Sequence, residues 1–206
     1  MARLLVWFHS FTKSWGLSIM LLAVFIYVAL FYFSMKSTQA LKKMQEVQPL
    51  LAQIKEKYKD NPEKFQKETL EIYKKHKINP LGGCLPLLFQ MPIFIALYQV
   101  LPRFVDIKGA SFLWIKDLSI PDQAFRLPAY FPIQYLNILP LLMVVAMFVQ
   151  QKLTSTQVTA DQKTMSYVFL VMFGFIFYNF PACLVLYWLM QTILTCVYQM
   201  YVFRPI

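Results

Sequence analysis

The sequence has few charged residues: they make up 15% of its 206 positions, against 58% hydrophobic residues. So low a charge content excludes an ordinary soluble domain. The content of 19 Phe, 12 Tyr and 4 Trp excludes disordered and low-complexity classes, which are poor in aromatic residues. Three cysteines, Cys84, Cys183 and Cys196, stand apart inside hydrophobic runs, so neither a disulfide framework nor a zinc site is expected.

Signatures of catalysis are also missing. The sequence contains no GxxxxGK[ST], HExxH or GxSxG motif, and its two histidines, His9 and His76, are far apart. Acidic residues, which cation-coupled transporters commonly use within the membrane, are absent from the long hydrophobic runs. We therefore expect no catalytic site, metal or cofactor, and neither an enzyme nor a driven pump.

What the sequence does contain is five apolar runs of the length that crosses a bilayer, about 20 residues each. They predict an all-α membrane protein with five transmembrane helices and a cytoplasmic helical hairpin between the first two. The predicted spans are residues 15–35, 80–102, 133–151, 164–180 and 181–203. The connecting segments are residues 36–79, an external loop at 103–132, a cytoplasmic loop at 152–163 and a tail at 204–206.

The distribution of basic residues predicts the orientation. The net charge is +10, and residues 36–79 alone hold 11 Lys and Arg; with Lys152, Lys163 and Arg204 that side has 14, against six on the other. Basic residues concentrate in cytoplasmic loops. We therefore expect the C-terminus in the cytoplasm and the N-terminus outside.

Residues 1–14 are too short and too polar to span a membrane. Trp7, Phe8 and Phe11 alternate with Arg3, His9 and Lys13, which is typical of an amphipathic helix lying on the outer leaflet. The segment can equally be what remains of a longer natural N-terminus, and the two interpretations are compatible.

The segment 36–79 shows helical periodicity interrupted at DNPE, residues 60–63. Asp60 or Asn61 can cap a second helix that begins at Pro62, so the segment predicts two antiparallel helices, the first bent at Pro49. Two interpretations stay open: a solvated helical pair without a partner, or a basic surface that faces lipid head groups or a large polyanion such as a ribosome.

Uncharged polar residues occur inside the spans. Gln90 lies in the second run, while Gln191, Thr195 and Gln199 share one face of the fifth because they are four residues apart. Amides facing hydrocarbon are unfavourable unless they are satisfied. This face therefore either makes interhelical hydrogen bonds or lines a water-containing cavity open to the cytoplasm.

Six sequence runs resemble the YidC-type membrane protein insertases, a family with mitochondrial and chloroplast relatives. They are WGLSI (15–19), KKMQEVQP (42–49), INPLGGCLPLLFQMPIFIALY (78–98), FLWIKDLSIPD (112–122), QQKLT (150–154) and FPACLVLYWL (180–189). The resemblance covers nearly the whole chain, and the motifs occur in the family's order.

The resemblance implies an insertase and chaperone of the bacterial plasma (inner) membrane. It would take short hydrophobic segments of nascent membrane proteins into a hydrophilic groove open to the cytoplasm and release them sideways into lipid, without nucleotide. The implied partners are the ribosome, a targeting factor, the general translocation channel and anionic lipid, with the monomer as the functional unit. The implied groove residues are Tyr27, Gln90, Gln151, Trp188, Gln191 and Thr195. The hairpin, with Lys42, Lys55, Lys57, Lys59, Lys64 and Lys67, would be the receiving element.

One position departs from the family pattern. Aligning WGLSI places Tyr27 where the family usually has an arginine, so electrostatic attraction of acidic substrate tails should be weak or absent. An apolar packing role for Tyr27 is an equal alternative, as interior packing is for Trp188. Two other function classes remain: an assembly subunit of a larger membrane complex, and a small channel or transporter, which would need a pathway that is polar from end to end.

Overall fold

The computed structural model describes residues 2–59, 61–79, 85–101, 104–128, 134–154 and 160–203. In this part of the chain the structure is mostly helical, with an irregular loop and a short strand pair between α6 and α7. The elements are α1 (Ala2–Thr12), α2 (Trp15–Ala29), α3 (Phe31–Glu46), α4 (Gln48–Lys57), α5 (Pro62–Lys75), α6 (Leu85–Val100), η3 (Val105–Ile107), β1 (Phe125–Arg126), β2 (Tyr135–Leu136), α7 (Ile138–Leu153), α8 (Ala160–Tyr178) and α9 (Ala182–Val202).

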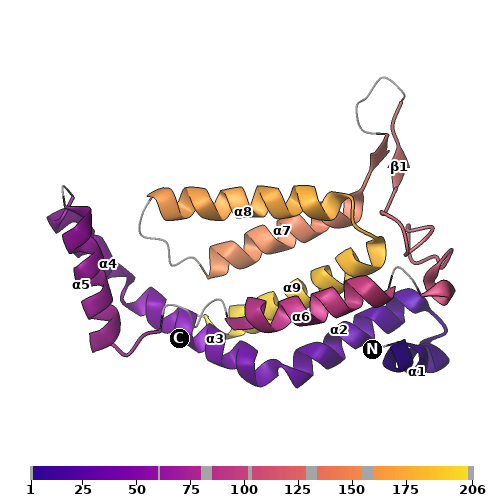
Figure 1. Ribbon diagram of the computed structural model, residues 1–206, viewed down its shortest axis with the longest axis horizontal. Coiled ribbons are helices and arrows are strands. Elements are labelled where there is room, and N and C mark those ends of the chain that lie inside the picture. The colour runs from indigo at the N-terminus through magenta and orange to yellow at the C-terminus, as the bar shows by residue number, and fades with distance from the viewer. Residues whose placement is uncertain are drawn as a thin grey trace.

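Helix α9 lies at the centre of the bundle. It packs against α2 on one side and α7 on the other, α7 also packs against α8, and α1 packs against α2 (Figure 1). We call the end of the bundle near α1, β1 and the start of α9 the loop end. The opposite end, from which α4 and α5 project, is the hairpin end (Figure 1).

Length and composition identify one helix among the described residues, α9, as able to cross a membrane alone. Helices α2 and α3 would form a second span if counted together, although they are bent by 66° at Leu30. Shorter apolar helices cover Leu88–Val100, Ile138–Leu153 and Lys163–Tyr178. The first predicted span therefore differs from the structure: the helix breaks at Leu30, and α3 continues through residue 35 to Glu46.

The predicted hairpin breaks are present. The first arm is interrupted at Val47, and Pro49 lies in the first turn of α4, where its missing N–H does no harm. Asn61 caps α5: its Oδ1 accepts a hydrogen bond from the Lys64 N–H at 3.0 Å. Asp60, the alternative cap, lies outside the described residues. Similarly, Pro181 separates α8 from α9.

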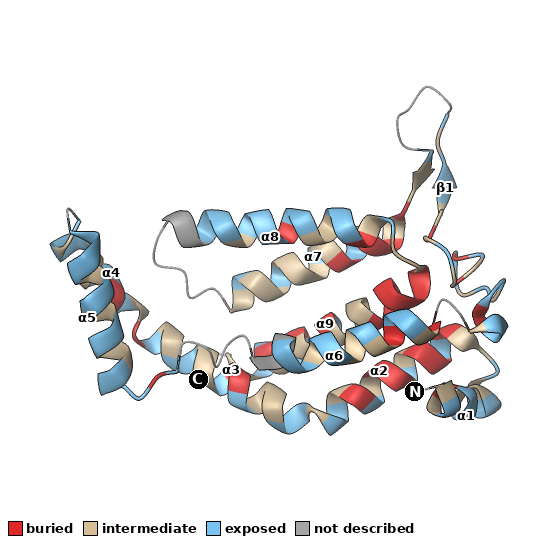
Figure 2. Ribbon diagram, viewed as in Figure 1, coloured by how far each residue is buried: buried red, intermediate tan, exposed pale blue. Residues whose placement is uncertain are grey.

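The two arms of the hairpin close on a small apolar seam. Val47, Leu51 and Ile78 are buried there, with Ile72 and Tyr73 packed against them. No residue of α5 is buried, so most of the hairpin surface is exposed (Figure 2).

The main core lies toward the loop end (Figure 2). Residues 182–187, the first six of α9, are at most 5% exposed, and Ile107, Ile115 and Leu118 from the loop pack into the same cluster. The loop is therefore part of the core and fixes how α9 begins.

Candidate functional site

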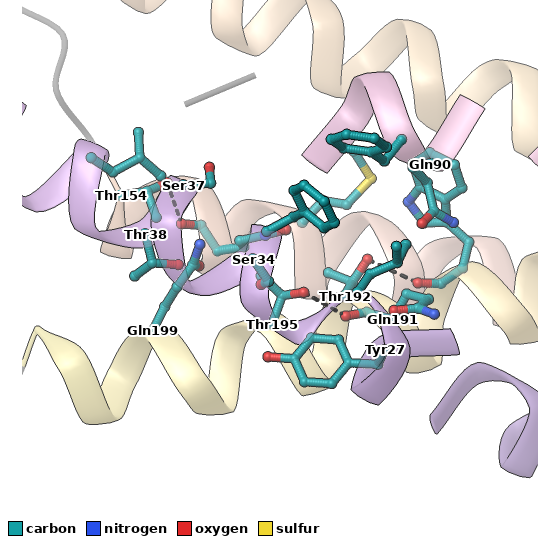
Figure 3. A pocket seen from close by; sticks show the side chains of 17 residues that line it. Tyr27, Ser34, Ser37, Thr38, Gln90, Thr154, Gln191, Thr192, Thr195 and Gln199 are labelled. Atoms are coloured by element: carbon teal, nitrogen blue, oxygen red, sulfur yellow. Dashed lines mark hydrogen bonds between the residues drawn. The ribbon is translucent and has the colours of Figure 1, made fainter. Parts of the chain in front are cut away.

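A cavity of about 340 Å³ lies between α2, α3, α6, α7 and α9 (Figure 3). Along α9 it extends from Trp188 to Gln199, roughly 16 Å at 1.5 Å per residue. Figure 3 shows polar side chains along its whole length, with Gln90 at one end and Gln199 and Thr154 at the other. None of the 17 described lining residues carries a formal charge.

Two glutamines tie the polar wall to neighbouring helices. Gln191 Nε2 donates to the Ala23 carbonyl of α2 at 2.9 Å and to the Tyr187 hydroxyl at 3.3 Å. Gln90 Nε2, on α6, donates to the same hydroxyl at 2.8 Å. Each of these two glutamines lines the cavity and also makes a hydrogen bond to another helix.

Toward the loop end the cavity stops at an aromatic cluster. The Trp188 ring centroid lies 5.2 Å from that of Phe177 and 5.3 Å from that of Phe94, and Phe177 lies 5.1 Å from Phe180. Phe177 is only 2% exposed. Edge-on and tilted aromatic contacts at these distances are favourable. Trp188 therefore contacts both the cavity and its seal.

Beyond the aromatic cluster, the loop satisfies the backbone at the helix ends. The Ala182 and Cys183 N–H groups donate to the carbonyls of Ile120 and Leu118 at 2.8 and 2.9 Å. Asp122 Oδ2 accepts from the Leu139 N–H at the start of α7, at 2.7 Å. Free N–H groups at a helix start need such partners when they are buried. The loop thus covers the bundle at this end and binds the first residues of α7 and α9.

Five of the six predicted groove residues line this cavity: Tyr27, Gln90, Trp188, Gln191 and Thr195. Gln151 does not line it, whereas its neighbour Gln150 does. Successive residues of an α-helix point about 100° apart, so only one of the two glutamines can face a given cavity.

The sequence prediction omitted polar residues of α3, namely Ser34, Ser37 and Thr38. Tyr27, Ser34 and Thr38 are seven and four residues apart, a spacing that would place them on one face of an unbroken helix. The predicted first span ends at residue 35, so it separates Ser34 from Ser37 and Thr38, which all belong to α3.

The predicted hairpin lysines lie outside the cavity. Lys55 and Lys57 are on α4, Lys59 follows it, and Lys64 and Lys67 are on α5. All but the half-buried Lys55 are exposed. Lys42 belongs instead to α3, and its Nζ donates to the Val202 carbonyl at the end of α9, at 3.4 Å. Nearby, Gln45 Nε2 donates to the Leu153 carbonyl at the end of α7, at 3.0 Å.

Comparisons with known proteins agree with this architecture. Residues 7–206 match the model of a protein family described as 60Kd inner membrane protein. The chain is 43% identical over 202 residues to the membrane protein insertase YidC of Syntrophobacter fumaroxidans, and 42% identical over 199 residues to that of Pelobacter propionicus. Each match covers 96% of this chain but 36% of the relative, so the chain spans just over a third of their length.

A solved structure gives the same result for the fold. It is described as an active YidC insertase with its first transmembrane domain resolved, and it superposes with a TM-score of 0.76 at 30% sequence identity. The similarity covers 95% of this chain and 43% of that chain.

Proposed function

Because the chain belongs to the 60Kd inner membrane protein family, we propose that it is a membrane protein insertase and chaperone. It takes short hydrophobic segments of nascent membrane proteins into the cavity and releases them into the bilayer. The observation that carries this proposal is the asymmetry of the cavity, which has a polar wall toward the hairpin end and an aromatic seal toward the loop end.

Such a cavity lowers the barrier to insertion without catalysis. A polar tail in hydrocarbon loses its hydrogen bonds, and each unsatisfied group costs several kcal/mol. The polar wall replaces some of those bonds while the tail is inside the membrane. Each leucine-sized side chain that then reaches lipid contributes about 1.5–3 kcal/mol. Burial of the apolar segment therefore supplies the driving force, and neither nucleotide nor an active site is required.

The proposed topology has five spans, formed by the bent pair α2–α3 and by α6, α7, α8 and α9. The excess of basic residues around the hairpin supports placing the hairpin end and the C-terminus in the cytoplasm, with the N-terminus outside. Helix α1 would then lie on the outer leaflet. Its exposed Trp7 and Phe11, at 56% and 70% exposure, suit the lipid interface.

The proposed partners follow from the surfaces on the cytoplasmic side. Nascent segments enter the cavity, and the exposed lysines of the hairpin face anionic lipid or a ribosome. A targeting factor and the translocation channel would act on the same side, with the monomer as the working unit. A channel is less compatible with the structure, because the aromatic cluster and the loop close one end of the cavity.

Reconstitution tests the proposal directly. The purified chain is placed in sealed liposomes, and a one-span protein is synthesised in their presence. We expect a larger protease-protected fraction than with empty liposomes, and a loss of that gain when residues 48–75 are deleted. This deletion keeps Lys42 and Gln45, which contact α9 and α7. Protection no better than with empty liposomes, with the chain shown to be folded, would contradict an autonomous insertase.

A further inference from the structure

A two-residue turn near the loop end carries two large apolar side chains on its outside. Phe112 and Ile115 exchange two backbone hydrogen bonds, each 2.9 Å long, and this leaves Leu113 and Trp114 at the tip of the turn. Leu113 is 74% exposed and Trp114 is 40% exposed. We call these two residues the loop tip.

The base of this turn is held in the core. Ile115 is 1% exposed and belongs to the main buried cluster, and Phe112 packs against the same cluster. The Leu118 N–H donates to the Ala110 carbonyl at 3.0 Å, which closes the loop around the turn. Because both ends of the turn are fixed in this way, the loop tip is held away from the core.

The backbone of Leu113 is strained. Its φ is +53°, in the left-handed region, which is unfavourable for a residue with a Cβ atom. Two-residue turns usually place glycine, asparagine or aspartate at such a position. The same loop does use a glycine, Gly109, for another positive φ of +72°. A strained and exposed leucine in a turn that suits glycine indicates that its side chain binds something.

The depth of the loop tip follows from its neighbours. The Phe112 ring lies against Gly16, the second residue of α2. The Leu118 carbonyl accepts a hydrogen bond from the Cys183 N–H, in the first turn of α9, at 2.9 Å. In the proposed topology both helix starts lie at the outer surface of the bilayer, so the loop tip lies near the level of the outer head groups.

The chemistry of the loop tip suits lipid better than a protein partner. Tryptophan is enriched at membrane interfaces, where its ring lies among the head groups. Lys116, which follows the turn, is exposed and can donate to lipid phosphates. A stable protein interface buries about 1,000 Å² or more, which two side chains on one turn do not supply. Lipid can surround both side chains, because it needs no complementary shape.

We propose that the loop tip is a membrane anchor, in which Leu113 and Trp114 insert into the head-group region of the outer leaflet. The proposal rests on the proposed topology, and it adds a lipid contact that does not depend on which segments the protein inserts. Because the loop also binds the first residues of α7 and α9, the anchor fixes the depth of these helix ends in the bilayer.

Tryptophan fluorescence in liposomes tests this placement. The chain has four tryptophans, and the full-length variant used here keeps only Trp114, with Phe in place of Trp7, Trp15 and Trp188. We expect phosphatidylcholine brominated near the head group to lower Trp114 emission about twofold, because the ring lies at the interface. Lipid brominated at the chain end should quench it less. Acrylamide added to the water should quench it much less than it quenches free tryptophan.

Two substitutions in this variant test the part played by the leucine. Leu113→Ser removes one of the two apolar side chains of the loop tip, so it should lower quenching by the brominated lipid and raise quenching by acrylamide. Val105→Ser is the matched control, because Val105 is 76% exposed in the same loop but lies outside the turn. This control should leave both kinds of quenching unchanged.

The outcomes separate the anchor from the topology on which it rests. Strong acrylamide quenching of Trp114 with weak quenching by brominated lipid would place the loop tip in water, and protection from both quenchers would place protein over it. Either result overturns the anchor. A second variant that keeps only Trp7, which is 56% exposed on α1, then shows whether the topology stands. Quenching of Trp7 by the brominated lipid supports the placement of the loop end at the leaflet, and its absence overturns that placement too. Comparing the unmodified chain with Trp114→Phe decides the matter if the single-tryptophan variants do not fold.

Discussion

Gly16 offers a sharp test of how the loop is held against the first span. A Cβ atom built on Gly16 would lie 2.0–2.6 Å from three ring atoms of Phe112, far inside van der Waals contact. The nearest of these is Cγ, which is bonded to the Phe112 Cβ, so turning the far end of the ring does not relieve the clash. Phe112 is also fixed by two backbone bonds with Ile115, each 2.9 Å long. The substitution Gly16→Ala must therefore push the loop away from α2.

Whether Gly16→Ala raises or lowers stability shows whether Phe112 packs against this position. In an unobstructed helix, Gly→Ala stabilises by about 0.5–1 kcal/mol, whereas overpacking a well-packed contact costs about 1–3 kcal/mol. We therefore expect Gly16→Ala to lower stability, by up to about 2 kcal/mol after the helical gain is subtracted. For a chain of this size that is a fall in Tm of about 4–8 °C.

Thermal unfolding in detergent, followed by circular dichroism, measures this shift. Gly174→Ala in α8 is the comparison variant: its Cβ would approach a single atom, Cγ2 of Val144, at 2.8 Å, so we expect a smaller loss of stability. A double-mutant cycle with Phe112→Ala should give a coupling of about 1–3 kcal/mol. Stabilisation by Gly16→Ala, or no coupling to Phe112, would refute the proposed packing of loop on helix.

Three further measurements test other parts of the structure. Phe177→Ala empties the centre of the aromatic seal, so it should lower stability by about 3–5 kcal/mol and make dye-loaded proteoliposomes leak ions. Asn61→Ala removes the cap of α5 and should cost about 1 kcal/mol locally, seen as faster hydrogen exchange in that helix with unchanged exchange in α9. Partial burial raises the pKa of Asp117, but hydrogen bonds from Ser119 and Gly109, together with the nearby Lys108 charge, outweigh it and hold the pKa below its ordinary value. A carbon NMR titration of the Asp117 carboxyl should therefore show a midpoint below the ordinary pKa, and this midpoint should rise in Ser119→Ala. The ionised carboxylate makes a small contribution to stability above the ordinary pKa, and this contribution should disappear as the pH falls through the lowered pKa.

The hairpin could be predicted because its breaks depend on local chemistry. Proline and an Asn cap determine where a helix begins whatever packs against it, and Pro49 and Asn61 are found at such starts. The break at Leu30 has no such signal, since neither proline nor glycine is near it. A bend of this kind depends on what the two halves pack against, which a hydropathy pattern does not contain.

The shared face of three polar lining residues could be predicted for a similar reason. Gln191, Thr195 and Gln199 are polar residues in an apolar run, and their spacing alone places them on one face. The choice between Gln150 and Gln151 depends on the rotation of α7 about its axis, which only the packing of α7 on α9 determines. Family resemblance suggested Gln151, and the structure places Gln150 at the wall.

If the chain acts as the proposed insertase, the sequence of α9 favours sideways release of a segment from the cavity. Residues 182–187 are buried, and every polar lining residue of this helix lies after Trp188. Tyr187 marks the boundary, where its hydroxyl accepts hydrogen bonds from Gln90 and Gln191. A polar tail moving along the wall loses its partners at this point, because the next turn of α9 offers only packed apolar side chains. We infer that the apolar part of the segment then gains more by entering lipid between the helices than by continuing toward the loop end.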